Sequence, residues 1–545
     1  MTDANVLLTD VATVSEADLR EASQRLGLTI KEEETEDYLK LMGQFKQSLD
    51  MVMSFPDHLP PVDYDVFPRY NIRVPSDAEN ALKGWATKVS VSGRRGGCLE
   101  GKTICLKDNI CLAGVPCQFG TDVVSDFVPS TDATIVTRIL EAGGNIIGKA
   151  TCENMSHGAA SDSSPGRPVE NPYAKGFSAG GSSSGCGALI GSGEVDMGMG
   201  GDQGGSVRLP AAFCGLVGLK PTLGLVPYTG VLSSEASVDY VGPMTRTVLD
   251  NALLLEIVAG YDGIDDRQLG APARAFVPHY ANDVLSSRRP EYPLMGTRIG
   301  ILQQGIELPR LQPQVGRLFE LAVQRFRHLG AQVTPVSVPR HREILPATTV
   351  INKMGSSQTR IGRQCQRRAL YLNEYFEKLL PWDQAKWDRA HTYVKNTSLC
   401  AEYAWGGACL RYATAYGRAV NQIRKLKEEY DAVLKECDVL IMPTVPFTAK
   451  RHSNPDGGPW HTHDHYAGII ANTSQFNGTG HPALSIPMGV APPMDDFILS
   501  PSDKDIRLPV GLQIVGNLWD EGTVYRVADA WERSAGDWRQ IEAEM

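Results

Sequence analysis

The stretch GGDQGGSVRLP, residues 200–210, surrounds a single serine with four glycines, an acid and an arginine. Glycine has no Cβ atom, so such a loop lets backbone N–H groups approach a bound group closely. Four consecutive donors are available, from Gln203, Gly204, Gly205 and Ser206. Such donors suit an oxyanion hole, with Ser206 as the nucleophile of an acyl transfer. Asp202 and Arg208 flank the serine and are expected to pair and brace the loop, although a purely structural tight turn is the alternative.

The glycine-rich segment begins upstream, with Ala179-Gly180-Gly181-Ser182-Ser183-Ser184-Gly185, and eleven glycines lie between residues 180 and 205. A phosphate-binding Walker loop ends in Gly-Lys-Ser or Gly-Lys-Thr, and this segment has neither. A flexible linker would not contain the apolar run Ala188-Leu189-Ile190. The remaining interpretation is a rigid site in which the backbone comes close to a bound group.

The bulk composition argues against several classes of protein. The 545 residues carry a net charge of -10 with a pI near 5.6, which disfavours nucleic acid or an anionic membrane as a partner. No apolar run approaches the roughly 20 residues that span a bilayer. The 11 cysteines are scattered without a Cys-x-x-Cys pair, so a zinc ribbon is not expected. Free thiols, and a first segment (Met1-Thr2-Asp3-Ala4) unlike a signal peptide, favour a cytoplasmic location.

The pattern of apolar residues changes at about residue 85. Residues 1–85 are predicted to form a helical extension, with one helix capped by Ser15 and a second at about 33–53. Residues 86–545 alternate short apolar strands with amphipathic helices, one of which Asp132 is expected to cap. The expected strands are Thr103–Leu106, Asn145–Gly148, Arg298–Leu302, Gln332–Thr334, Val439–Met442, Ala483–Ile486 and Val510–Val515. This alternation predicts an α/β fold with a mixed, mostly parallel twisted sheet flanked by helices.

Residues 340–435 are rich in aromatic residues and in helix formers. They are candidates for a helical cap over a pocket. The alternative is that these aromatic side chains only fill the spaces between helices, as they do in most protein cores.

The run Gly180–Gly230 resembles the amidase signature family of serine hydrolases. Further agreement is found in Leu106-Lys107-Asp108-Asn109, in Gly148–Glu153, in Asp438–Thr444, in GHPALSIPMG at 480–489 and in LPVGLQIVG at 508–516. The resemblance therefore extends from about Leu99 to the C-terminus. The Asp-Gln variant of the serine loop and the helical extension are most similar to the nitrile-pathway amidases of bacteria. The resemblance implies the amidase-signature fold, no cofactor, and a homodimer formed through the N-terminal helices.

The family uses a Ser–Ser–Lys triad. The resemblance places the nucleophile on Ser206, a bridging serine after a cis peptide bond on Ser182, and the base on Lys107. One departure is visible, because the family commonly has two glycines after its serine pair and this chain has Ser184 and Gly185. A lysine has an ordinary pKa of about 10.4, and burial at a strand end would favour its neutral form. Neutral Lys107 would then accept a proton from Ser182, which accepts one from Ser206 during attack on an amide carbonyl.

Two other patterns compete with this interpretation. The segment 181–185 also matches the Gly-x-Ser-x-Gly elbow of α/β-hydrolase esterases, with Ser183 as nucleophile and His481 as base, but that leaves the Ser206 loop unexplained. In the amidase interpretation Ser183 is a structural support. Three histidines on a segment expected to be extended, His461, His463 and His465, could bind a metal, yet their Gly- and Pro-rich neighbourhood favours solvated side chains and no metal site.

The sequence thus predicts an amidase that converts small carboxamides to carboxylic acids and ammonia through an acyl-enzyme, without a metal. Aliphatic and aromatic acyl groups both stay open, as do esters, carbamates and anilides. Gln203, beside the oxyanion donors, is a candidate to orient the leaving NH₂. The alternative within the same superfamily is the amide-hydrolysing subunit of a tRNA amidotransferase. The acidic charge, the helical extension and the Asp202-Gln203 pair favour a free-standing enzyme.

Overall fold

The computed structural model describes residues 12–360, 368–406 and 412–543. The chain divides into two compact units, with the border between Pro60 and Pro61. Strand β1 (Tyr70–Arg73) and the start of β2 (Trp85–Val91) therefore belong to the second unit, although they lie within the segment predicted as a helical extension. The extension that is helical ends near residue 53.

The first unit contains two helices, α1 (Glu16–Leu26) and α2 (Thr35–Met53). Ser15 caps α1 as predicted, because its hydroxyl accepts the N–H of Asp18 at 3.2 Å while the Asp18 carboxylate accepts the Ser15 N–H at 2.9 Å. Helix α2 leaves several large apolar side chains exposed to solvent, among them Leu41, Phe45 and Leu49.

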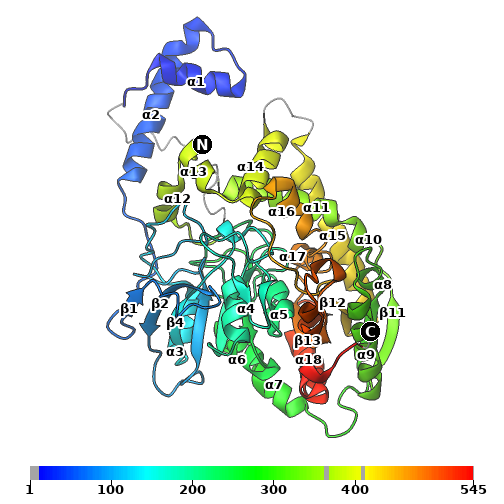
Figure 1. Cartoon of the computed structure of the whole chain (residues 1–545). Coiled ribbons are helices and arrows are strands. Elements are labelled where there is room, and N and C mark those ends of the chain that lie inside the picture. Colours follow the sequence, from blue (N-terminus) through cyan, green and yellow to red (C-terminus); the bar gives the residue numbers. More distant parts are fainter. Residues whose placement is uncertain (1–11, 361–367, 407–411, 544–545) are drawn as a thin grey trace. The chain divides into compact units, whose positions relative to one another are not determined.

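One mixed sheet runs through the second unit (Figure 1). In the described residues it has twelve strands. Their order in space is β1, β2, β4 (Asn145–Ala150), β3 (Thr103–Lys107), β7 (Met197–Asp202), β9 (Tyr240–Thr245), β8 (Val217–Lys220), β13 (Ala483–Ala491), β14 (Leu508–Gly516), β12 (Val439–Pro443), β10 (Arg298–Leu302) and β11 (Gln332–Val336). A separate hairpin pairs β5 (Glu170–Asn171) with β6 (Ala174–Ser178). Every strand expected from the sequence lies in the large sheet, and the α/β class is confirmed.

Most neighbouring strands in this sheet are antiparallel, so the predicted mostly parallel arrangement is wrong. Only β3 with β4 and β7, and β10 with β11 and β12, are parallel in the described sheet. Continuous apolar runs are typical of parallel strands because such strands are buried on both faces. In β12, Val439 and Ile441 pack into one apolar cluster and Leu440 and Met442 into another, and all four are fully buried. The runs therefore report burial of both faces and not strand direction.

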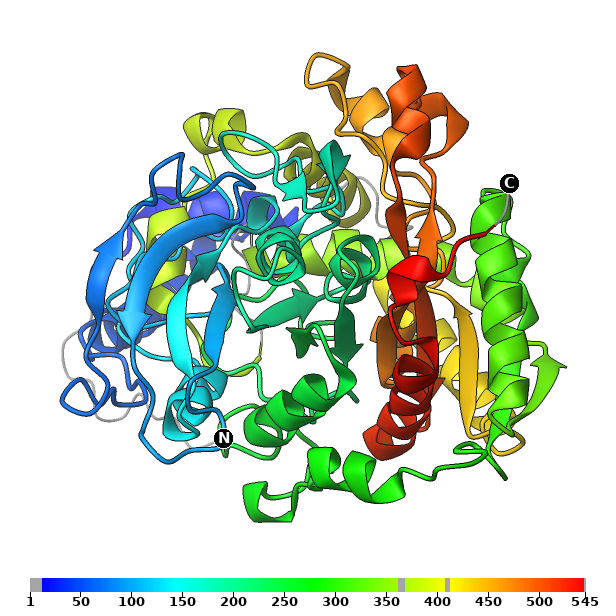
Figure 2. The ribbon, with the colours of Figure 1, turned by 60° about the horizontal axis from the view of Figure 1, so that its bottom comes forward.

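Helices cover both faces of the sheet (Figures 1 and 2). The largest apolar cluster joins one face to α3 (Thr134–Glu141), α6 (Val248–Val258), α7 (Tyr280–Ser287), α9 (Pro313–His328) and α18 (Glu521–Ala535). Two further clusters join the other face to α4 (Ser184–Gly191), α5 (Arg208–Phe213), α11 (Leu345–Arg360), α15 (Ala415–Val433) and α17 (Ser474–Thr479). The shorter or peripheral helices are α8 (Gln303–Ile306), α10 (Arg340–Glu343), α12 (Asn373–Leu379), α13 (Gln384–Arg389), α14 (Thr392–Trp405) and α16 (Gly458–His465). No helix in the described ranges has both the length and the apolar character that crossing a membrane requires.

Asp132 does not cap α3, contrary to expectation. The helix begins after Ala133, whose side chain makes no capping hydrogen bond. The Asp132 carboxylate instead pairs with Arg69 and accepts the N–H of Ala113 at 2.8 Å. The carboxylate therefore binds Arg69, which lies 63 positions away in sequence. Local sequence spacing cannot predict a contact of this kind.

Candidate active site

Lys107 is the last residue of β3, and its side chain is completely buried. Its Nζ lies 2.7 Å from Ser182 Oγ and donates to the carbonyl oxygen of Gly201 at 3.1 Å. Burial lowers the pKa of Lys107, although nearby groups that include Asp202 act in the opposite direction. A buried amine with a lowered pKa, in contact with a hydroxyl, has the position and the chemistry of a general base.

Ser182 belongs to the short segment that leads into α4. The Gly181–Ser182 peptide bond is cis. The Ser182 carbonyl accepts the N–H of Glu153 at 3.0 Å, and the next residue, Ser183, donates its N–H to the carbonyl of Ser206 at 3.3 Å. The backbone that carries Ser182 is thus bonded directly to the residue predicted as nucleophile. The structure brings Lys107, Ser182 and Ser206 to one place.

Ser206 lies in the turn between β7 and α5. The residue is 7% exposed, and it lines a cavity of about 370 Å³ together with Gln203 and Gly204. The serine is therefore enclosed but open on the side of a cavity, as a nucleophile that must meet a substrate has to be.

A buried network of charges and hydrogen bonds braces this turn. Asp202 pairs with Arg208 at 3.0 Å, and both side chains are completely buried. The Asp202 carboxylate also accepts the N–H groups of Gly205 (2.7 Å) and Val207 (3.1 Å) and the Asn477 Nδ2 (2.8 Å). Burial alone would raise the pKa of Asp202, but the Arg208 charge and these donors outweigh it and hold the pKa well below its ordinary value. The carboxylate is ionised and fixes the loop from inside.

The oxyanion donors differ in one respect from the prediction. The N–H of Gly205 is occupied by Asp202, so it is not free for a substrate oxygen. For Gln203, Gly204 and Ser206, no partner of the backbone N–H is found in the described part of the chain. Asp202 lies three residues before Gly205, so its carboxylate reaches this N–H locally. The backbone at Gly205 has a φ of +137°, and a Cβ there would lie 2.6 Å from Thr473 Oγ1, which explains the glycine. Three of the four predicted donors remain available.

The cavity is lined mainly by three parts of the chain besides the serine loop. One is the turn that includes Ser156, His157 and Gly158, which follows β4. The second is the pair of helices α11 and α14, which supply Thr349, Asn352, Lys353, Tyr393, Asn396 and Thr397. The third is the segment Tyr466–Ile470 after α16. Residues of the segment 340–435 therefore do line the cavity. Its aromatic side chains have different positions: Tyr393 is at the cavity wall, whereas Tyr375 and Phe376 lie in an apolar cluster.

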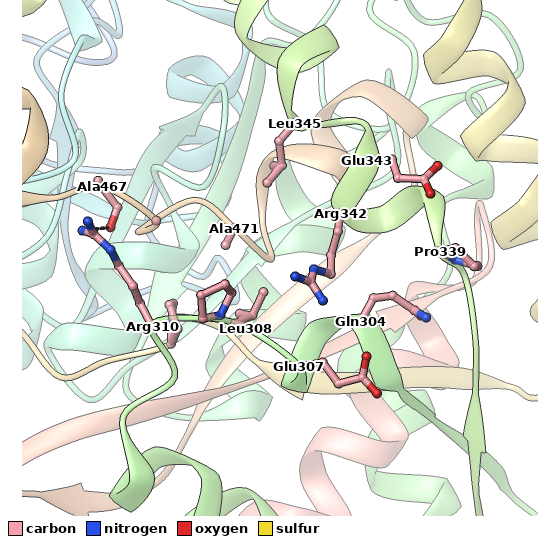
Figure 3. A pocket seen from close by; sticks show the side chains of 13 residues that line it. Gln304, Glu307, Leu308, Arg310, Pro339, Arg342, Glu343, Leu345, Ala467 and Ala471 are labelled. Atoms are coloured by element: carbon pink, nitrogen blue, oxygen red, sulfur yellow. Dashed lines mark hydrogen bonds between the residues drawn. The ribbon is translucent and has the colours of Figure 1, made fainter.

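A larger hollow, of about 750 Å³, lies elsewhere and contains none of the predicted catalytic residues. Figure 3 shows side chains that line it, among them Arg310, Glu307 and Arg342. It shares Ala467 and Gly468 with the catalytic cavity, and Arg310 donates to the carbonyl of Ala467 at 3.1 Å. Most of its charged side chains are exposed, so the cavity at Ser206 is the better candidate for chemistry.

The competing motifs are not assembled into sites. The Ser183 hydroxyl donates to the Gly201 carbonyl at 3.1 Å and accepts the Gly201 N–H at 3.2 Å. The two ring nitrogens of His481 contact Thr479 and Asp431, each at 3.0 Å, and neither contacts Ser183. The histidines at 461, 463 and 465 lie on helix α16 and not on an extended segment, so residues two apart do not share a face. In the described residues no cluster of three or more metal-ligating side chains is present.

Several residues of the site were not predicted. Arg208 also donates to the carbonyl of Thr473 and to the side chains of Gln513 and Asn477, at 2.7–2.9 Å. Thr473 in turn donates to the Gly204 carbonyl at 2.6 Å. These partners lie more than 260 positions from the serine loop in sequence. No local pattern marks them, because the sequence indicated only the pairing of Arg208 with Asp202.

Comparison with known proteins gives consistent results. The family model described as Amidase matches residues 68–525. The enantioselective amidase of Rhodococcus rhodochrous is 35% identical over 475 residues, covering 85% of each chain. The glutamyl-tRNA(Gln) amidotransferase subunit of Trichodesmium erythraeum is 30% identical over 455 residues, covering 83% of this chain and 88% of the relative. Among solved structures, the native peptide amidase of Stenotrophomonas maltophilia is 29% identical with a TM-score of 0.64, covering 82% of this chain and 85% of that one.

Proposed function

We propose that this chain, which belongs to the amidase family and hydrolyses amide C–N bonds, acts on small carboxamides and releases a carboxylic acid and ammonia. The cavity of about 370 Å³ at Ser206 supports this substrate size. Esters, carbamates and anilides present the same kind of acyl carbon and are further candidate substrates.

The proposed reaction starts with neutral Lys107. Its amine accepts the proton of Ser182, Ser182 accepts the proton of Ser206, and Ser206 Oγ attacks the amide carbonyl carbon. The resulting oxyanion is stabilised by the backbone N–H groups of Gln203, Gly204 and Ser206. The protons then return through Ser182 to the leaving nitrogen, which departs as ammonia and leaves an acyl-enzyme. Water attacks this ester by the same route and frees the acid.

One observation carries the proposal: Lys107 Nζ is 2.7 Å from Ser182 Oγ in a completely buried position. An exposed lysine would keep its proton at neutral pH, because its ordinary pKa is about 10.4. Burial favours the neutral form that the reaction needs. Asp202, Arg208 and Ser183 act as supports in this scheme, since their side chains bond to the loop and to β7 and do not line the cavity.

The proposal is tested by measuring ammonia release from a panel of primary carboxamides, with matched esters and anilides, by the wild type, Ser206→Ala and Ser182→Ala. Both variants should lose at least about a hundredfold in kcat/KM, since each removes a step of proton transfer or nucleophilic attack. His481→Ala is the matched control for the esterase interpretation and should keep wild-type activity. Full activity in Ser206→Ala would refute the assignment of the nucleophile.

A second candidate function is the amide-hydrolysing subunit of a tRNA amidotransferase. It is supported by the 30% identity to a glutamyl-tRNA(Gln) amidotransferase subunit over 83% of this chain. Ammonia release by the purified chain alone favours the free-standing enzyme. Release that requires added partner subunits, with glutamine as the substrate, would favour the amidotransferase role.

Three further proposals concern organisation. A homodimer formed through the N-terminal helices is supported by the exposed apolar side chains of α2, and light scattering of the full chain against one lacking residues 1–60 tests it. A cap formed by residues 340–435 is supported by the six residues of α11 and α14 in the cavity wall. A cytoplasmic location is supported by the cysteines of the described ranges, all of which are free thiols.

A further inference from the structure

Helix α11 supplies the cavity at Ser206 with a charged side chain. Among the described residues that line the cavity, Lys353 is the single lysine or arginine, and none is Asp or Glu. The Lys353 side chain is half-buried, and its Nζ contacts the Sγ of Cys400 at 3.4 Å. It makes no ion pair within the part of the chain that the structure describes. A cation in a cavity wall without an acid partner is a binding group for an anion.

His157, which lines the same cavity, contacts a second cation, Arg360. Arg360 Nη1 lies 2.6 Å from His157 Nδ1. A guanidinium can only donate, so Nδ1 must present its lone pair, and the proton of a neutral imidazole is then on Nε2. Burial, followed by the charges of Arg360 and Lys353, lowers the pKa of His157 well below its ordinary value. The ring is therefore neutral, and its Nε2 lies 3.5 Å from the same Arg360 nitrogen.

Arg360 places a second cation behind this wall. It lies on α11 two turns after Lys353, and residues seven apart on a helix share a face. Arg360 is almost fully buried, and its Nε and Nη2 have no partner in the described residues. Burial lowers its pKa to about 10, which still leaves it charged at neutral pH.

Glu153 is an acid that lies behind the His157 turn. Glu153 is completely buried, and a Cβ on Gly158 would lie 2.3 Å from its Oε2. Desolvation raises the pKa of Glu153 well above its ordinary value, and the charge of Asp239 acts on Arg360 to raise the pKa of the guanidinium. At the cavity surface itself, the Lys353 charge has no acid beside it among the described lining residues.

We propose that Lys353 binds a carboxylate on the acyl portion of the substrate, so that the enzyme prefers monoamides of dicarboxylic acids. This inference rests on the proposed function, because it concerns the substrate of the same cavity. A carboxylate accepts a hydrogen bond from the Lys353 ammonium and is attracted by its charge and by that of Arg360, whereas an alkyl or phenyl group would leave the half-buried ammonium without a counter-charge. The apolar side chains of Leu209, Ile469 and Ile470 line the rest of the cavity and would contact the carbon chain that separates carboxylate from amide. A cationic amide would be repelled.

The test compares three amides of similar size: succinamate, its neutral isostere 4-methylpentanamide, and the cationic 4-aminobutanamide. The wild type should have the highest kcat/KM for succinamate. In Lys353→Met the ratio of kcat/KM for succinamate to that for 4-methylpentanamide should fall roughly ten- to a hundredfold, mainly through KM, since a hydrogen bond to a charged group is lost. Lys353→Glu should prefer the cationic amide. Lys425→Met, which changes an exposed lysine of α15, is the matched control and should keep the wild-type ratio.

Equal losses on all three amides in Lys353→Met would mean a structural role and would overturn the inference. A wild type that prefers 4-methylpentanamide would also overturn it, while leaving the amidase proposal intact. A separate readout covers failure of that proposal: succinamate binding to Ser206→Ala, measured by calorimetry. Binding that weakens at least tenfold with Lys353→Met supports the carboxylate site even if no amide is hydrolysed, and binding that Lys353→Met leaves unchanged refutes it.

Discussion

Asp202→Asn should destabilise the protein strongly, because it leaves a buried arginine without a counter-charge. Arg208 is completely buried and donates two hydrogen bonds to the Asp202 carboxylate, each of 3.0 Å. The same carboxylate accepts two backbone N–H groups of the serine loop. Removing one partner of a buried ion pair typically costs about 3–5 kcal/mol. We expect the free energy of unfolding to fall by that amount at pH 7.

Urea unfolding followed by tryptophan fluorescence measures this change, and a double-mutant cycle isolates the pair. The double variant Asp202→Asn with Arg208→Met should be less destabilised than the sum of its two singles, with a coupling of at least about 2 kcal/mol. The pKa of Asp202 in the folded protein is well below its ordinary value of about 3.9. The contribution of the ionised carboxylate to the free energy of unfolding is therefore complete above pH 4 and is lost as the pH falls further. The difference in free energy of unfolding between wild type and Asp202→Asn should accordingly shrink in acid. A difference in free energy of unfolding below about 1 kcal/mol between wild type and Asp202→Asn at pH 7 would refute the reasoning.

Other predictions follow from single contacts. Gly205→Ala should abolish activity, because its Cβ would lie 2.6 Å from Thr473 Oγ1 at a φ of +137°. Gly204→Ala should fold normally, because the nearest atom to its Cβ is 3.9 Å away. Ammonia release and thermal midpoints check both variants, and an active Gly205→Ala would contradict the geometry. The buried His341 has its pKa lowered to about 4, so the unfolded chain binds more protons than the folded one between pH 6.5 and 4. Protonation of this group in the unfolded chain should therefore lower the free energy of unfolding by up to about 3 kcal/mol as the pH drops through that range. His341→Gln should reduce the slope of the free energy of unfolding against pH.

The fold class and the serine loop could be predicted because their signals are local. Apolar runs marked the strands β3, β10, β12, β13 and β14, since a buried strand must be apolar whatever its partners are. The loop at 200–210 could be recognised from its glycines. The backbone requires glycine at position 205, because φ there is +137°. The Ser15 cap could be predicted for the same reason, because a capping box spans four residues, here Ser15 to Asp18.

What could not be predicted depends on residues that are distant in sequence. The direction of each strand depends on how the chain connects it to its neighbours, and an apolar run does not indicate that direction. Asp132 pairs with Arg69 instead of capping a helix, and Asn477 completes the Asp202 network from 275 positions away. Lys353 was not singled out from the sequence, because the absence of an acid among the described residues of the cavity wall depends on several distant segments.

The central claim is that a neutral, buried Lys107 activates Ser206 through Ser182. The most direct measurement is the rate at which a fluorophosphonate labels the protein, followed by mass spectrometry across pH in the wild type and in Lys107→Met. The account predicts labelling on Ser206, with Lys107→Met slower by about 10²–10⁴-fold near pH 7 and recovering as hydroxide concentration rises. Equal labelling rates for the two proteins at neutral pH, or an adduct on Ser183, would contradict it.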